Sequence, residues 1–222
     1  MATGTTTPSR SQVEQIVRQV VTARLSGGRS GAPRLQVHAS ARHMHVSRED
    51  LDRLFGPGYE LTVERPLPQP GNFAARETVT LIGPRSRLIS NLRILGPLRQ
   101  RSQIELAFTD AVSLGYDDLP IRLSGNLDGT PGALVMGPKG IVELPGGLIR
   151  AAMHVHMNPG EAAHYGVKQG DLMKLRIGGD APVTFERVHV RVDPHSLLDV
   201  HMDTDEANAC GLVRARQIEL FK

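Results

Sequence analysis

Beyond Leu35 the sequence is a series of short apolar runs interrupted by turn residues, and this punctuation limits what the chain can fold into. There are 23 Gly and 15 Pro in 222 residues. Short runs rich in branched residues and bounded by Gly or Pro are typical of β-strands joined by turns. The clearest runs are residues 79–82, 88–89, 104–108, 172–177 and 188–192. The pattern predicts a mainly β fold with few helices.

Two segments of this region resemble each other. Residues 43–51 and 154–162 each begin with a His-x-His pair, continue with Ser or Asn as a helix cap, and end in an acidic stretch. Helices are expected at 50–55 and 159–165. The repeat predicts two related β-barrels with short capping helices. We assign residues 34–44 together with about 153–222 to the first barrel, and about 45–152 to the second.

The first 33 residues have a different character and form a separate segment in this prediction. Within residues 12–25, apolar side chains recur at the spacing of an amphipathic helix, and residues 26–33 are rich in Gly and Ser, as in a flexible tether. A short helix on a tether is marginally stable alone, so it is expected to dock. Docking onto the protein's own core and docking into a groove of a partner remain equal alternatives.

Composition excludes several classes of protein. No apolar run approaches the roughly 18 residues of a membrane span, so a soluble intracellular protein is expected. The single cysteine, Cys210, fits a reducing compartment. Eight aromatic residues and scattered basic residues argue against nucleic-acid binding. Arg greatly outnumbers Lys, which indicates either anion recognition or a GC-rich genome.

The two His-x-His pairs are the main candidates for a functional site. Alternate residues of a strand face the same side, so His43 and His45 project together, as do His154 and His156. Two imidazoles so placed can bind one ion such as Zn²⁺. His201 is a third candidate, because it ends an apolar run before an acidic stretch. Two pairs in matching contexts favour a metal site over chance.

A carboxylate and nearby arginines complete this candidate site. Glu105 alternates with apolar neighbours, where an unpaired charge would be costly. Its partner is therefore expected to be either an arginine or a metal ion. Arg99 and Arg101 lie just before it, and Arg93 is a weaker candidate of the same kind. A buried carboxylate, a metal ion and an arginine suit transfer to or from a phosphate oxyanion.

Several segments together resemble one enzyme family, the phosphotransacylases of bacterial microcompartments (the PduL type). The match runs in order through nearly all of the chain from Leu35 to Lys222. It rests on residues 41–47, 69–74, 93–99, 103–105, 123–125, 154–156 and 201–208. The resemblance implies acyl transfer between coenzyme A and phosphate. It also implies two β-barrels and two closely spaced divalent ions, both expected to be zinc.

The resemblance also implies roles for individual residues. The metal ligands fall on His43, His45, Glu105, His154, His156 and His201, the phosphate-binding arginine on Arg99, and an asparagine near the site on Asn208. Residues 12–25 are similar to an encapsulation peptide. This shifts the expectation toward binding of microcompartment shell or core proteins, and toward a cytoplasmic location inside a microcompartment. A homo-oligomer is left open, as is the acyl chain, propanoyl or acetyl.

The sequence leaves competing interpretations. Met153 stands where the family has an arginine, so anion affinity could differ. Cys210 could be an acyl-carrying nucleophile, although a lone cysteine is more often a small buried residue. A di-metal hydrolase of thioesters or phosphate esters could use the same ligands, and a metal-binding β-barrel scaffold is a third possibility.

Overall fold

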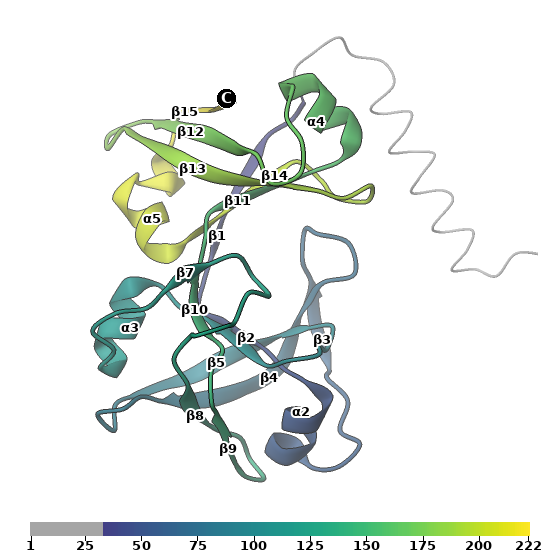
Figure 1. Cartoon of the computed structure of the whole chain (residues 1–222), viewed down its shortest axis with the longest axis vertical. Helices are drawn as coiled ribbons and strands as arrows, with labels where there is room; N and C mark the ends of the chain where they lie inside the picture. Colours follow the sequence, from purple (N-terminus) through teal and green to yellow (C-terminus); the bar gives the residue numbers. More distant parts are fainter. Residues whose placement is uncertain (1–32) are drawn as a thin grey trace, which may run out of the picture. The chain divides into compact units, whose positions relative to one another are not determined.

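A computed structural model describes residues 33–222, and it confirms the mainly β fold, with two curled half-barrel sheets and a few short helices (Figure 1). The predicted amphipathic helix of residues 12–25 and most of its tether lie outside the described residues. Four of the five apolar runs that indicated strands fall wholly in strands. The fifth is shorter than expected, because the run 104–108 ends as a strand at Glu105 and Phe108 begins a helix.

The first sheet has six strands and draws them from both ends of the described region. Its order is β1 (Gln36–Ser40), β14 (Asp199–Asp203), β11 (His154–Met157), β13 (Val183–Val192), β12 (Leu172–Gly178) and β15 (Gln217–Phe221). The central strand β11 runs antiparallel to β14 and parallel to β13. Register partners on β14 and β13 therefore lie on the same face of the sheet as the histidines of β11.

The second sheet has nine strands. Its order is β7 (Ile121–Arg122), β10 (Leu148–Ala151), β6 (Gln103–Glu105), β2 (His43–His45), β5 (Leu88–Gly96), β4 (Phe73–Ile82), β8 (Ala133–Met136) and β9 (Ile141–Leu144), and β3 (Val63–Pro66) pairs with β4. The strand β2 runs antiparallel to β6 and parallel to β5. Each His-x-His strand thus lies between an antiparallel and a parallel neighbour.

The helices are short, and the two predicted ones begin at polar caps. The predicted helices are confirmed as α2 (Arg48–Phe55), capped by Ser47, and α4 (Pro159–Tyr165), capped by Asn158. Two further helices are α3 (Phe108–Leu114) and α5 (Thr204–Ala209), and a 3₁₀ turn η1 (Leu212–Arg214) follows α5. In α2 and α4 the cap lies two residues after the second histidine of the pair, so the helix starts near the histidines. The sequence repeat therefore corresponds to a repeated strand–cap–helix unit.

Each sheet packs on its own apolar core. One core contains Met44, Leu81 and Ile104, and the other contains Val155, Met173 and Val200. Arg150 on β10 links the two sheets, because its guanidinium pairs with Asp203 and, at 2.6 Å, with Glu206. The predicted division into two domains stays a prediction, and β2, at the predicted boundary, joins the nine-stranded sheet.

Candidate metal centre

Strands β2 and β6 bring three candidate ligands together in the nine-stranded sheet. His43 and Glu105 are register partners across the two strands, and His45 lies on the same face as His43. His43 Nε2 lies 3.2 Å from His45 Nε2 and 3.5 Å from Glu105 Oε2, and His45 Nε2 lies 4.0 Å from Glu105 Oε1. All three side chains are buried. The structure therefore gathers the predicted residues of this cluster at one point.

The chemistry of these atoms fits a divalent cation. The His43 Nδ1–H donates to the carbonyl of Ala41 at 2.8 Å, so Nε2 keeps its lone pair. Burial, followed by the charges of His43 and Arg99, lowers the pKa of His45 to about 2, so this imidazole is neutral. Two nitrogens bound to one tetrahedral Zn²⁺ at about 2.0–2.1 Å would be roughly 3.3 Å apart. The observed 3.2 Å between the imidazole nitrogens matches that spacing.

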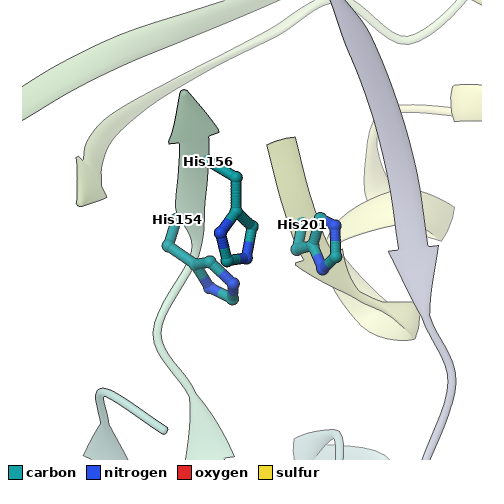
Figure 2. A group of neighbouring side chains, drawn as sticks. All are labelled: His154, His156 and His201. Atoms are coloured by element: carbon teal, nitrogen blue, oxygen red, sulfur yellow. The ribbon is translucent and has the colours of Figure 1, made fainter. Parts of the chain in front are cut away.

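A second cluster forms in the six-stranded sheet from His154 and His156 on β11 and His201 on β14 (Figure 2). The three rings face a common space, with centroids 4.9–5.2 Å apart. One ligand atom from each lies within 4.8 Å of the others. Burial, followed by the charge of His201, lowers the pKa of His154 to about 3 and that of His156 to about 4. These two imidazoles are therefore neutral, as metal ligands must be.

Asp199 supports the second cluster and was missed from the sequence. Its carboxylate is fully buried, and it accepts hydrogen bonds from His201 Nε2 at 3.0 Å and from His38 Nδ1 at 2.8 Å. Burial opposes its ionisation, but His201 and His38 outweigh burial and lower its pKa. A carboxylate that holds a ligand imidazole fixes the orientation of its ring. The acidic character of residues 199–206 was visible in the sequence, but not that Asp199 faces the histidines.

The two clusters are built on the same plan. In each, the first histidine donates its Nδ1–H to the alanine carbonyl two residues earlier, His43 to Ala41 and His154 to Ala152. In each, the antiparallel neighbour supplies the third candidate ligand opposite that histidine, Glu105 on β6 or His201 on β14. Two residues before the third ligand, a polar side chain bonds to it, Gln103 to Glu105 and Asp199 to His201.

Arg99 is connected to the first cluster through one hydroxyl. Its Nη1 donates to Ser124 Oγ at 2.9 Å, and Ser124 Oγ donates to Glu105 Oε1 at 2.8 Å. Burial opposes ionisation of Glu105, but His43, Ser124, His154 and Arg99 outweigh it and lower the pKa of this carboxyl. Glu105 is therefore an anion, and Arg99 lies beside it as predicted.

The other two candidate arginines have different partners. Arg101 is exposed and pairs with Asp128 at 3.5 Å, away from the histidines. Arg93 is the parallel register partner of His43, but its guanidinium pairs with Glu64 at 2.8 Å. Neither side chain is placed to meet a ligand at the first cluster in this structure.

The two clusters lie next to each other. Glu105 and Leu106 from one sheet and His154, His201 and Asp203 from the other line a narrow space of about 20 Å³. Glu105 of the first cluster and His154 of the second thus border the same space. The two clusters therefore border a common space through Glu105, His154 and His201, and together they form one composite candidate site.

The remaining predicted residues have mixed outcomes. Asn208 is exposed near the end of α5 and does not line this narrow space, so its role in the site stays a prediction. Met153 packs into the apolar core with Val155. Cys210 is buried as expected, its Sγ faces the carbonyl of Ala207, and burial raises the pKa of its thiol.

Of the other histidines, His164 and His195 are exposed, and His189 is half-buried as the register partner of His154. Within residues 33–222, none of the helices has the length and apolar character that crossing a membrane requires.

Comparison with known proteins identifies the family. A sequence model described as phosphate propanoyltransferase matches residues 36–213. The phosphate propanoyltransferase of Planctopirus limnophila is 48% identical, covering 96% of this chain and 92% of the relative. The enzyme of Thermotoga maritima is 49% identical, covering 81% of this chain and 85% of the relative. The enzyme of Salmonella typhimurium is 47% identical, covering 78% of this chain and 81% of the relative. The chain therefore belongs to the phosphate propanoyltransferase family of acyltransferases.

Proposed function

We propose that the protein is a phosphotransacylase that interconverts propanoyl-CoA plus phosphate with propanoyl phosphate plus CoA, and that it also accepts acetyl-CoA. The observation that carries the proposal is the composite site, in which two ligand clusters lie beside Arg99 in a chain of this family. The two acyl groups differ by one methylene, worth only about 1–3 kcal/mol of discrimination even in a shaped pocket. Acceptance of both is therefore expected.

The residues fit two divalent cations, with zinc as the proposed metal. His43, His45 and Glu105 would hold one ion, and His154, His156 and His201 the other. When bound, such ions supply Lewis acidity for carbonyl and phosphate oxygens and a soft partner for a thiolate. The clusters differ in charge, because Glu105 is an anion whereas His154 and His156 are neutral.

Arg99 is proposed to bind and orient phosphate. Its guanidinium is partly buried yet bonded only to a neutral hydroxyl, Ser124 Oγ, among the described residues. A guanidinium presents a planar fork of donors that matches two oxygens of a phosphate group. Holding phosphate next to the thioester makes the attack effectively unimolecular.

Transfer is proposed to be direct, without an acyl-enzyme. A phosphate oxygen attacks the thioester carbonyl carbon, the new C–O bond forms, the C–S bond breaks, and the electron pair leaves with the CoA sulfur as thiolate. Cys210 is unsuited as a nucleophile, because its thiol is buried with a raised pKa and faces a backbone carbonyl. None of the described residues needs to carry the acyl group in this scheme.

A thiol-release assay tests the proposal. Propanoyl-CoA and acetyl-CoA are each incubated with the purified protein, with and without inorganic phosphate, and with and without a chelator. Thiol release that requires phosphate, yields acyl phosphate and is abolished by chelation is the expected result. Release of free propanoate without phosphate would instead identify a thioester hydrolase, and metal binding without turnover would identify a scaffold.

We further propose that residues 12–25 bind shell or core proteins of a bacterial microcompartment and that the enzyme works inside one. The support is the amphipathic spacing of this segment and the Gly- and Ser-rich tether that follows it. Fusing residues 1–33 to a fluorescent protein in cells that assemble such compartments tests this. Diffuse fluorescence, with no enrichment in the compartments, would contradict it.

A further inference from the structure

A polar pocket of about 470 Å³ opens beside the second cluster and has no role in the function described so far. Its lining includes Gln69, Asn72, His156, Gln169, Arg191 and Ser196. The volume lies in the range of small-molecule sites. Because His156 belongs to both the pocket and the second cluster, the pocket leads directly to the candidate metal centre.

Arg191 is the main positive group of this pocket and lies next to the candidate ligands. It is the register partner of His156 across the parallel strands β11 and β13, so both side chains face the same side of the sheet. Its charge contributes to lowering the pKa of His154, His156 and Arg99. Arg191 on β13 and Arg99, which follows β5, are therefore close enough for their charges to interact.

The charge of Arg191 is not neutralised locally. Within residues 33–222, no carboxylate oxygen lies within 4.0 Å of its guanidinium nitrogens, whereas Arg93 and Arg150 are each paired with a carboxylate. Among the described residues, Asp193 is the only acidic one that lines the pocket. It is exposed, and its Oδ1 accepts the backbone N–H of His195. The inner part of the pocket is therefore positive.

Hydrogen bonds between protein groups hold the pocket walls in place. Gln69 Nε2 donates to the carbonyl of Leu197 at 3.3 Å, and Gln69 Oε1 accepts from the Leu197 N–H at 3.4 Å. Gln169 Oε1 accepts from the Val192 N–H at 2.7 Å. A preformed, polar, positively charged pocket suits an anion rich in oxygen acceptors.

We propose that this pocket is the phosphate subsite, and that Arg191 binds the phosphate of the reaction together with Arg99. The proposal rests on the proposed phosphotransacylase activity and names its second phosphate-binding residue. The phosphates of CoA are the competing source of the same chemistry. They are separated from the reacting sulfur by the long pantetheine arm, whereas Arg191 lies beside the candidate metal ligands, where the attacking phosphate must be.

Steady-state kinetics of three variants test the proposal. Arg191→Gln removes the charge, and Arg191→Lys keeps it without the fork of donors. Arg187→Gln is the matched control, because Arg187 is an exposed arginine of the same strand that does not line the pocket. Loss of a charge-assisted hydrogen bond should raise the KM for phosphate about 10- to 100-fold in Arg191→Gln. The KM for propanoyl-CoA should stay unchanged, Arg191→Lys should be intermediate, and Arg187→Gln should match the wild type.

A rise in the KM for propanoyl-CoA alone would assign the pocket to the CoA phosphates and overturn the proposal. A fall in kcat with both KM values unchanged would also overturn it. Titration calorimetry with inorganic phosphate provides a readout without turnover, and the wild type should bind more tightly than either Arg191 variant. If the wild type shows no phosphate-dependent turnover, the proposed function fails, and the calorimetry still decides whether Arg191 binds phosphate. If Arg191→Gln does not fold, equal phosphate affinity in Arg191→Lys and the wild type would refute the role of Arg191.

Discussion

Acid should destabilise the metal-free protein through its buried neutral histidines, and His45 allows the effect to be calculated. Its pKa is about 2 in the folded protein and about 6.5 in an unfolded chain. Below pH 6.5 the unfolded state therefore binds more protons than the folded state, so stability falls as the pH falls. At pH 5, 1.5 pH units below the unfolded pKa, the loss is about 2 kcal/mol for His45.

The measurement is urea unfolding with chelator present, at pH 7 and at pH 5, for the wild type and for His45→Gln. Stability lost between the two pH values should be about 2 kcal/mol larger in the wild type, because the glutamine does not titrate. Burial raises the pKa of Glu161 and Glu206, which stabilises the fold as the pH falls, but this contribution is common to both proteins and cancels. An equal pH dependence in the two proteins would refute the account of His45 as a desolvated neutral ligand.

Four further substitutions test the site and its supports. Asp199→Asn should weaken metal binding about 10- to 100-fold, because the amide cannot accept from both histidines, as competition with a chromophoric chelator would show. Glu105→Gln should reduce the metal content from two ions to one per chain in elemental analysis, whereas full retention would remove Glu105 from the ligand set. Cys210→Ala should leave acyl transfer largely intact while lowering the free energy of unfolding by about 1 kcal/mol, and a collapse in rate with metal retained would contradict direct transfer. Arg150→Met should cost about 3–5 kcal/mol in denaturant unfolding, because two carboxylates lose their buried cation, and an unchanged midpoint would show that the pair does not stabilise the fold.

Much of the fold could be predicted because its signals are local. Turn residues bound the strands, and the capped helices after each His-x-His pair follow from Ser47 and Asn158. The error at residues 104–108 has a physical cause. The apolar pattern of a strand continues to Ala107. The carboxylate of Asp110, however, accepts a hydrogen bond from the Ala107 N–H and caps a helix that begins at Phe108. The Asp110 side chain, three residues beyond Ala107, therefore favours a helical backbone at this point.

The site could be predicted only where alternation along one strand was enough. That reasoning paired His43 with His45 and His154 with His156, but it could not show what lies across the sheet. Arg191 and Asp199 face the second pair because β13 and β14 take a particular register against β11. The register between strands far apart in the sequence depends on tertiary packing, so it cannot be predicted from the pattern of one strand.

The two clusters share one backbone arrangement, so their difference in chemistry comes mainly from one side-chain position. Because the same backbone arrangement supports both, the main difference lies in the position opposite the first histidine, which is Glu105 in one cluster and His201 in the other. The anionic Glu105 would contact a bound cation directly and reduce its net charge, whereas the carboxylate of the second cluster, Asp199, would act only through His201. Arg191 lies beside that second cluster. In the proposed function, a phosphate dianion held by Arg99 and Arg191 would therefore be repelled less on the side of His154, His156 and His201 than on the side of the anionic Glu105.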